Sequence, residues 1–232
     1  MRLIANESHI KSRTRVGELA PFSGLLILAV ATLVVFWKPE WSWATLLLIW
    51  VGFIISLIGG YLGGRYVGPL AHHKKVPEAL KGLENSFTLL MYKTPAPFVL
   101  VDAGGVTVIT VRSQSGKIAY QNSKWQHKEK MGWLRRFAGQ EGVGRPDQLA
   151  MIDMEEFQRF LRKRLPEGVE VPVRTVILFV HPDAEVTAEG SPVPVFRIPE
   201  LKRWLRREGR RPNLSKDVLQ QLTEALKIEA EG

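Results

Sequence analysis

Thr110 and Arg112 are the residues whose types and spacing first raise a question of chemistry. They close the alternating stretch GVTVITVR (residues 105–112), which predicts a strand, and residues two apart on a strand share one face. A carboxylate and a lysine at these positions, with a second carboxylate nearby, would hold Mg²⁺ and position an attacking water. Here the first position carries a hydroxyl and the second a guanidinium, which keeps its proton at any biological pH. The side chains at these two positions therefore do not suit a metal site.

Asp102 is the best substitute acid, with Glu78 or Glu84 on a preceding predicted helix as a second one. Asp102 ends the apolar stretch PFVLVD (97–102) directly before Ala-Gly-Gly, and an Asp in that place more often forms the turn. The histidines of HHKK (72–75) are predicted to belong to a solvated basic patch rather than to a metal tract. We therefore expect no catalytic residue and no metal. Mg²⁺ or Mn²⁺ enters only in the alternative that displaced acids restore a site.

Two uncharged apolar runs, residues 19–37 and 41–64, stand before this region and predict a transmembrane hairpin. A bilayer core needs about 20 apolar residues per helix, and the short break between the runs allows only a tight connection. Trp37, Trp41 and Trp43 cluster at the break, as in an interfacial aromatic belt. A buried pair of helices in a soluble protein and a cleaved signal peptide are the alternatives. No small-x-small cleavage site follows the first run.

Charge predicts the orientation of this hairpin. The chain of 232 residues carries a net charge of +9 and no cysteine. Lysines and arginines precede the first run and follow the second, while the connecting loop has only Lys38, so both termini are predicted to be cytoplasmic in a two-span protein of the cell membrane. Small residues at four-residue spacing near the second exit could pack helices within the hairpin or between copies, or form a flexible exit. These residues are Gly59, Gly60, Gly63 and Gly64.

The predicted organisation has four parts. Residues 1–18 form a basic cytoplasmic segment, 19–64 the transmembrane hairpin, 65–75 a basic linker and 76–232 a cytoplasmic domain. Within the domain the patterns predict a helix over 77–92, an antiparallel meander of strands at 97–102, 106–112 and 117–121, and a helix over 146–165. A buried strand at 174–180, a short strand at 193–198 and helices from 199 and from 216, the last capped by Ser215, complete it. This order predicts an α/β fold, a small mixed sheet flanked by helices.

The order of elements and the residues from Pro97 through Gly116 to Trp125 resemble the nuclease-related domain (NERD) family, a branch of the restriction-endonuclease-like superfamily. The resemblance covers about residues 75–229. It implies a metal-binding Asp on the first strand and a Glu-x-Lys at the end of the second. Aligned without gaps, these positions are Pro97, Thr110 and Arg112, and all three depart from the pattern. The resemblance thus implies a degenerate site, and we expect a membrane-anchored binding or scaffolding module. The alternative is an active metal-dependent nuclease with displaced acids.

Two basic clusters suggest a polyanionic partner, either anionic lipid headgroups or nucleic acid. A solvated charged face and an unidentified protein partner remain open for both. The first cluster lies along a predicted amphipathic helix, and the second mixes cations with aromatic residues. Their cations are Lys202, Arg203, Arg206, Arg207, Arg210 and Arg211, and Lys124, Lys128, Lys130, Arg135 and Arg136.

Overall fold

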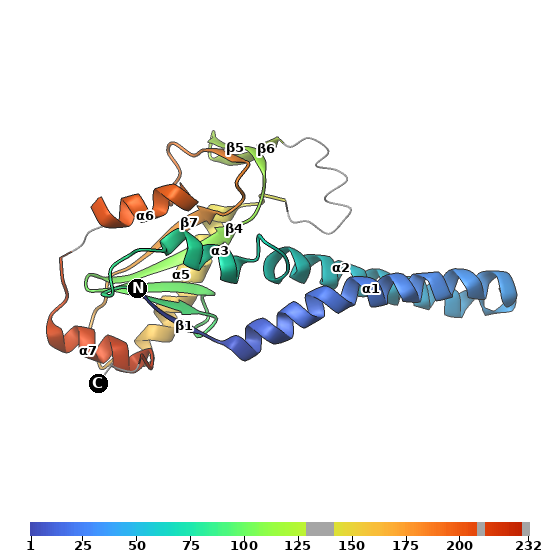
Figure 1. The fold of residues 1–232 in the computed structure, drawn as a ribbon, viewed down its shortest axis with the longest axis horizontal. Coiled ribbons are helices and arrows are strands. Elements are labelled where there is room, and N and C mark those ends of the chain that lie inside the picture. Colours follow the sequence, from blue (N-terminus) through green and yellow to red (C-terminus); the bar gives the residue numbers. More distant parts are fainter. Residues whose placement is uncertain (129–141, 208–211, 229–232) are drawn as a thin grey trace.

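A long helical hairpin projects from an α/β domain (Figure 1). The computed structural model describes residues 1–128, 142–207 and 212–228. Helix α1 (Glu7–Trp37) and helix α2 (Ser42–Tyr66) are antiparallel and are joined by the 3₁₀ turn η1 (Pro39–Trp41). Both helices are long and apolar enough to cross a membrane, and only 11% and 17% of their apolar stretches are buried within the chain. The hairpin therefore exposes most of its apolar surface.

Small residues at intervals of seven hold the two helices together. The buried small residues are Gly17, Gly24 and Ala31 on α1, and Thr45, Gly52 and Gly59 on α2. A Cβ atom on Gly59 would lie 2.5 Å from Cδ of Pro21, and one on Gly24 would lie 2.7 Å from the carbonyl oxygen of Gly52. A seven-residue repeat keeps one stripe of each helix on its partner, and small residues let the backbones approach closely.

The domain is built on a six-stranded mixed sheet in the order β1-β2-β3-β4-β7-β9. The strands are β1 (Arg2–Ala5), β2 (Thr88–Met91), β3 (Phe98–Asp102), β4 (Gly105–Arg112), β7 (Val173–Phe179) and β9 (Val195–Arg197). Strands β2, β3 and β4 are antiparallel, whereas β1 is parallel to β2, and β7 is parallel to both β4 and β9.

Two helices cover each face of this sheet. Helices α3 (His72–Leu80) and α6 (Ile198–Arg207) bury Leu80 and Leu201 against one face. Helices α5 (Pro146–Arg162) and α7 (Lys216–Ala225) bury Phe157 and Leu222 against the other. The expected mixed α/β fold with flanking helices, preceded by a helical hairpin, is confirmed.

Strand β1 precedes the hairpin and yet belongs to the same sheet as the strands that follow it. Its pairing with β2 runs from Arg2 beside Thr88 to Ala5 beside Met91. The chain thus leaves the sheet edge, forms the hairpin and returns through α3 (Figure 1). Both ends of the hairpin are consequently fixed to one domain. The segment expected at 1–18 contains β1 and the start of α1, and the linker expected at 65–75 contains the end of α2 and the start of α3.

The predicted meander through residues 117–121 is wrong. Strand β5 (Gly116–Gln121) lies in a second, three-stranded sheet between β6 (Lys124–Lys128) and β8 (Ala184–Thr187). Strand β4 already has β3 on one side and β7 on the other, so it has no edge left for β5. Gly116, with φ of 82°, lies where the chain turns into the new sheet.

The helix predicted over 77–92 is correct only in its first part. Helix α3 ends at Leu80, and Gly82 follows with φ of 83°, which favours glycine. Beyond it, Leu89 and Met91 pack into the core on one face of the sheet while Leu90 packs into the core on the other. Because both faces are covered, β2 is apolar throughout, and its residues also fit a helical spacing.

The remaining predicted elements are confirmed within the described residues. Helix α5 begins at Pro146, β7 is buried along most of its length, and α6 begins at Ile198, one residue before the expected start. The hydroxyl of Ser215 accepts a hydrogen bond from the backbone N–H of Val218 at 3.3 Å, which caps α7.

Candidate functional site

The end of β4 is polar on one face and apolar on the other. Val106 and Val108 lie in the core beneath α5, and Thr110 and Arg112 continue the same face toward the strand end. Ile109 packs into the opposite core, beneath α3 and α6. Thr110 and Arg112 are only 7% and 5% exposed. The polar pair is therefore buried, not displayed to solvent.

Thr110 donates a hydrogen bond to a carboxylate that the sequence analysis did not single out. Its Oγ1 lies 2.7 Å from Oδ2 of Asp153 on α5. Asp153 falls on the core-facing stripe of that helix, with Ala150 one turn before it and Phe157 one turn after. Burial raises the pKa of Asp153, while the Thr110 hydrogen bond and the charges of Arg65 and Arg112 oppose the rise.

Arg112 binds the backbone of a neighbouring segment. Its Nη2 donates to the carbonyl oxygens of Gly142 and Val143, at 2.9 and 2.5 Å. Gln114 also donates to the Gly142 carbonyl, at 3.3 Å. These bonds hold the segment that leads into α5 against the end of β4, so Arg112 has a structural role in positioning that segment.

The hairpin and α3 reach the same strand end. His72 opens α3 and is 7% exposed, and burial together with the charges of Arg65 and Arg112 lowers its pKa to about 3. His72 is therefore neutral, and its Nε2 is buried without a hydrogen-bond partner in the described part of the chain. The expectation that this histidine belongs to a solvated patch is wrong. Its position is explained by α3, which packs His72 near the ring of Phe98.

Aromatic rings join the hairpin to the domain beside this cluster. Tyr66 at the end of α2 lies 5.4 Å from Tyr92, and His9 on α1 lies 5.2 Å from the same ring. The Nε2 atom of His9 is 3.3 Å from the Tyr66 hydroxyl. Burial raises the pKa of Tyr92, so this phenol stays neutral. The contacts attach both helices of the hairpin to the domain.

Asp102 lies at the other end of the sheet from Thr110. It pairs with Gly105 at the start of β4, and its Oδ1 accepts a hydrogen bond from the Gly104 N–H at 2.6 Å. Thr110 is five positions after Gly105, which is about 17 Å along a strand. Pro97 falls opposite Thr110 if the β3–β4 register, with Val99 beside Val108, is continued by two residues. Asp102 forms the turn and does not replace an acid beside Thr110.

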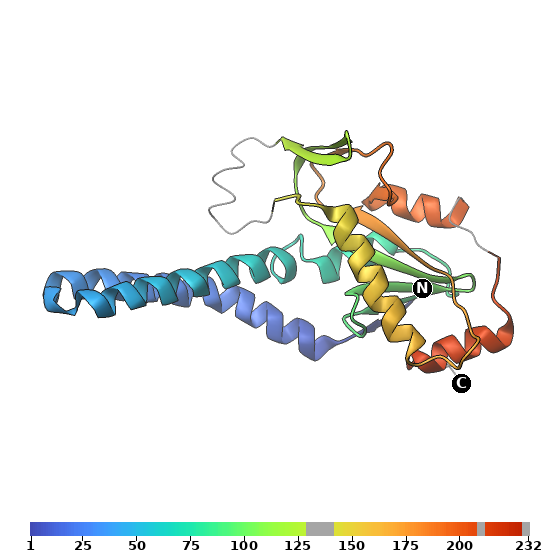
Figure 2. The ribbon, with the colours of Figure 1, turned by 180° about the vertical axis from the view of Figure 1, so that it is seen from behind.

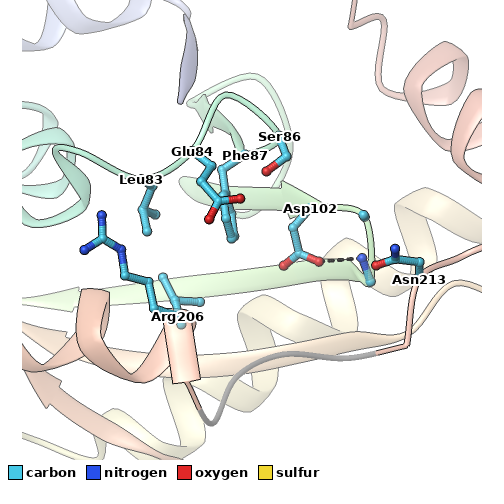
Figure 3. A pocket seen from close by; sticks show the side chains of 10 residues that line it. Leu83, Glu84, Ser86, Phe87, Asp102, Arg206 and Asn213 are labelled. Atoms are coloured by element: carbon cyan, nitrogen blue, oxygen red, sulfur yellow. Dashed lines mark hydrogen bonds between the residues drawn. The ribbon is translucent and has the colours of Figure 1, made fainter.

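A pocket of about 380 Å³ lies at this turn end of the sheet (Figure 3). Glu84 and Asp102 both line it, between Arg206 at one end and Asn213 at the other. Arg206 donates a hydrogen bond to the Gly82 carbonyl, so part of its guanidinium is already bound. Among the residues that the structure describes, no group of three His, Cys, Asp or Glu side chains could hold a metal ion.

The cations of α6 divide into two sets. Lys202 and Arg206 donate to the carbonyl oxygens of Lys81 and Gly82, which lie just after α3. Arg203 and Arg207 are exposed, while Leu201 and Leu205 are buried. The predicted Arg210 and Arg211 lie outside the described residues. The polyanion-binding role of these side chains stays a prediction, and two of them also anchor the helix.

Only part of the second predicted cluster lies within the described residues. Lys124 and Lys128 lie on strand β6 and are exposed, whereas Lys130, Arg135 and Arg136 lie outside the described part of the chain. Trp125 on β6 donates from Nε1 to Asp147 at 2.9 Å and packs on the core beneath the small sheet. Its ring is therefore part of the fold.

The predicted helix-packing glycines do not all face the same way. Gly59 contacts Pro21, and a Cβ on Gly63 would lie 3.6 Å from the Gly17 carbonyl oxygen. Gly60 is half-buried, and a Cβ on Gly64 would meet nothing within 4 Å. Gly59 and Gly63 therefore pack the hairpin internally, and Gly64 does not.

No protein-family model, no curated protein and no solved structure matches the chain. The architecture is therefore described by its own elements: two long apolar N-terminal helices followed by a mixed α/β domain, with a buried polar cluster at the end of β4.

Proposed function

We propose that the chain is a membrane-anchored, catalytically inactive nuclease-like domain of the NERD type, acting as a binding or scaffolding module at the cytoplasmic face of the membrane. The observation that carries the proposal is the bonding at the end of β4. Thr110 donates a hydrogen bond to Asp153, and Arg112 donates two hydrogen bonds to backbone carbonyls. Side chains that occupy the positions of a metal site thus serve the fold.

The chemistry of the three positions supports inactivity. A hydroxyl and a guanidinium are poor substitutes for a carboxylate and a lysine in holding a hard dication and orienting water. Pro97 has no side-chain ligand at all. Asp153 is one carboxylate, and a single carboxylate beside Arg112 does not make a Mg²⁺ site. No cofactor is therefore assigned.

The sheet supports an even number of membrane crossings. Because β1 pairs with β2, the residues before the hairpin and the domain after it lie on the same side of the membrane. The basic residues flanking the two runs favour the cytoplasm for that side. The exposed apolar surface of α1 and α2 is what a lipid-facing hairpin requires.

Single cysteines test this anchoring, since the chain has none of its own. Ser42 begins α2 at the hairpin tip, and Ser8 lies on α1 beside the domain; both are exposed. A maleimide that does not cross membranes should label Ser42→Cys in intact cells and leave Ser8→Cys unlabelled until the cells are opened. Labelling of Ser8→Cys alone would reverse the orientation, and labelling of both would exclude the two-span arrangement.

The active-nuclease alternative is favoured by one observation, the presence of Glu84 and Asp102 in one pocket. Full-length protein in detergent, incubated with Mg²⁺ or Mn²⁺ and DNA or RNA, separates the two proposals. We expect no cleavage. Cleavage that is lost in Asp102→Asn, which keeps an acceptor for the Gly104 N–H, would place the active site at the pocket and refute inactivity.

A further inference from the structure

The small sheet carries three lysines on its outer face. Lys117 on β5, and Lys124 and Lys128 on β6, are exposed and alternate with inward side chains such as Ile118, which is buried. In the register of these strands Lys117 lies directly opposite Lys128, and Lys124 lies opposite Gln121. These three side chains form what we call the lysine face.

The described part of the chain neutralises the lysine face poorly. Like charges directly opposite each other on neighbouring strands are destabilising. Oε2 of Glu185 on β8 is 3.9 Å from Nζ of Lys117, but both side chains are at least 70% exposed, and exposed pairs contribute little. Within the described residues, no acid pairs with Lys124 or Lys128. An external anion would relieve this repulsion.

The position of the small sheet indicates which anion is nearest. Strands β5 and β6 lie on the side of the domain that faces the hairpin, whereas α6 and α7 lie toward the opposite end (Figures 1 and 2). Helix α2 ends at Tyr66, only two residues beyond the uncharged run that ends at Gly64, which is about 3 Å of helix. A headgroup layer occupies roughly 5–7 Å outside the hydrocarbon core, and charges act over about 8–10 Å in physiological salt. A surface beside the base of the hairpin is therefore within reach of the headgroups.

We propose that the lysine face binds anionic lipid headgroups of the membrane that the hairpin spans, and so sets the tilt of the domain over the bilayer. This inference rests on the proposed anchoring. The basic residues of α6 do not take part, because that helix lies away from the hairpin and two of its cations bind the chain after α3.

Lysine acylation measured by mass spectrometry tests the proposal on the full chain. The protein is reconstituted into vesicles of phosphatidylcholine alone or mixed with phosphatidylserine. Lys117, Lys124 and Lys128 should react about fivefold more slowly in the anionic vesicles, the factor that corresponds to the attraction of one basic residue to such a surface. Lys163 at the C-terminal end of α5 and Lys216 at the start of α7 should react at equal rates in the neutral and the anionic vesicles. Equal rates for the lysine face would overturn the proposal.

Three further arms define the source of any protection. High salt should remove it, because the attraction is screened. Lys124→Gln with Lys128→Gln should return Lys117 to its rate in neutral vesicles, and the matched pair Lys163→Gln with Lys216→Gln should not. Equal protection by an oligonucleotide on neutral vesicles would assign the face to nucleic acid and overturn the lipid assignment. Flotation with neutral vesicles reports the anchoring separately, so its failure would refute the proposed function instead.

Discussion

Replacing Thr110 by valine removes one hydrogen-bond donor from the half-buried carboxylate of Asp153 and changes the side-chain shape very little. The Thr110 hydroxyl lies 2.7 Å from Oδ2 of Asp153, and Thr110 is 7% exposed. Valine has no hydrogen-bond donor, so the carboxylate of Asp153 loses the hydrogen bond that it accepts from Thr110. The variant therefore measures what the hydrogen bond contributes to the domain.

A hydrogen bond to a charged group contributes about 1.5–3 kcal/mol when the group is fully shielded. Asp153 is half-buried, so water replaces part of the lost bond, and the expected cost is about 1–2 kcal/mol. For a chain of this size that free energy lowers Tm by roughly 2–8 °C. The measurement is thermal unfolding of the full-length protein in detergent, followed by circular dichroism.

Thr175→Val is the matched control. Thr175 lies on β7, the strand beside β4, is 6% exposed, and its Oγ1 has no hydrogen-bond partner among the described residues. The same substitution should leave Tm unchanged or raise it, because it removes a buried hydroxyl that makes no bond. Equal shifts in the two variants would refute the reasoning, since the Thr110–Asp153 bond would then contribute nothing of its own.

Two further predictions concern the charge of Asp153 and the packing of the hairpin. The pKa of Asp153 is raised in the folded protein. Below the unfolded pKa of about 3.9 the carboxyl is protonated in both states, so burying it does not lower the free energy of unfolding. Above the folded pKa the carboxylate is charged in both states, and its burial destabilises the fold in full. Asp153→Asn should therefore gain stability relative to wild type as pH rises from about 4 to neutrality in melts of both proteins, and a constant difference would contradict the raised pKa. Gly59→Ala should separate α1 from α2, because the new Cβ would meet Pro21 at 2.5 Å, whereas Gly64→Ala has open space. Tm in detergent should fall by several degrees for the first and stay unchanged for the second, and equal values would show that the hairpin tolerates the clash.

The elements that the sequence predicts correctly are those with long or local patterns. The two apolar runs are too long for ordinary core helices, and Ser215 and Pro146 mark helix starts through their own backbone chemistry. Strand β7 is predictable because both faces of its sheet are covered, which makes it continuously apolar. None of these conclusions depends on which segments meet in space.

The elements that the sequence leaves out depend on distant partners. Strand β1 has four residues ahead of a helix, and only its pairing with residues 88–91 makes it a strand. Strand β5 is extended as expected, but it does not pair with β4. Strand β7, which lies much later in the chain, pairs with that edge of β4, and β5 pairs with β8 instead. Asp153 could have been noticed as an acid on the apolar stripe of α5, but nothing local connects it to Thr110.

The bonding at the end of β4 also indicates why adding one acid would not create a metal site there. Thr110→Glu would bring a second carboxylate to Asp153, and two carboxylates in one buried site repel unless one is protonated or a cation lies between them. Arg112 cannot serve as that cation freely, because its guanidinium already binds the carbonyls of Gly142 and Val143. If the proposed function is right, a metal site here would also require the segment before α5 to be repositioned, because Arg112 holds it. The polar residues of this strand end link the sheet to α5 through Thr110 and Asp153, and to the segment before α5 through Arg112, so a substitution at either position disturbs the packing of α5 as well.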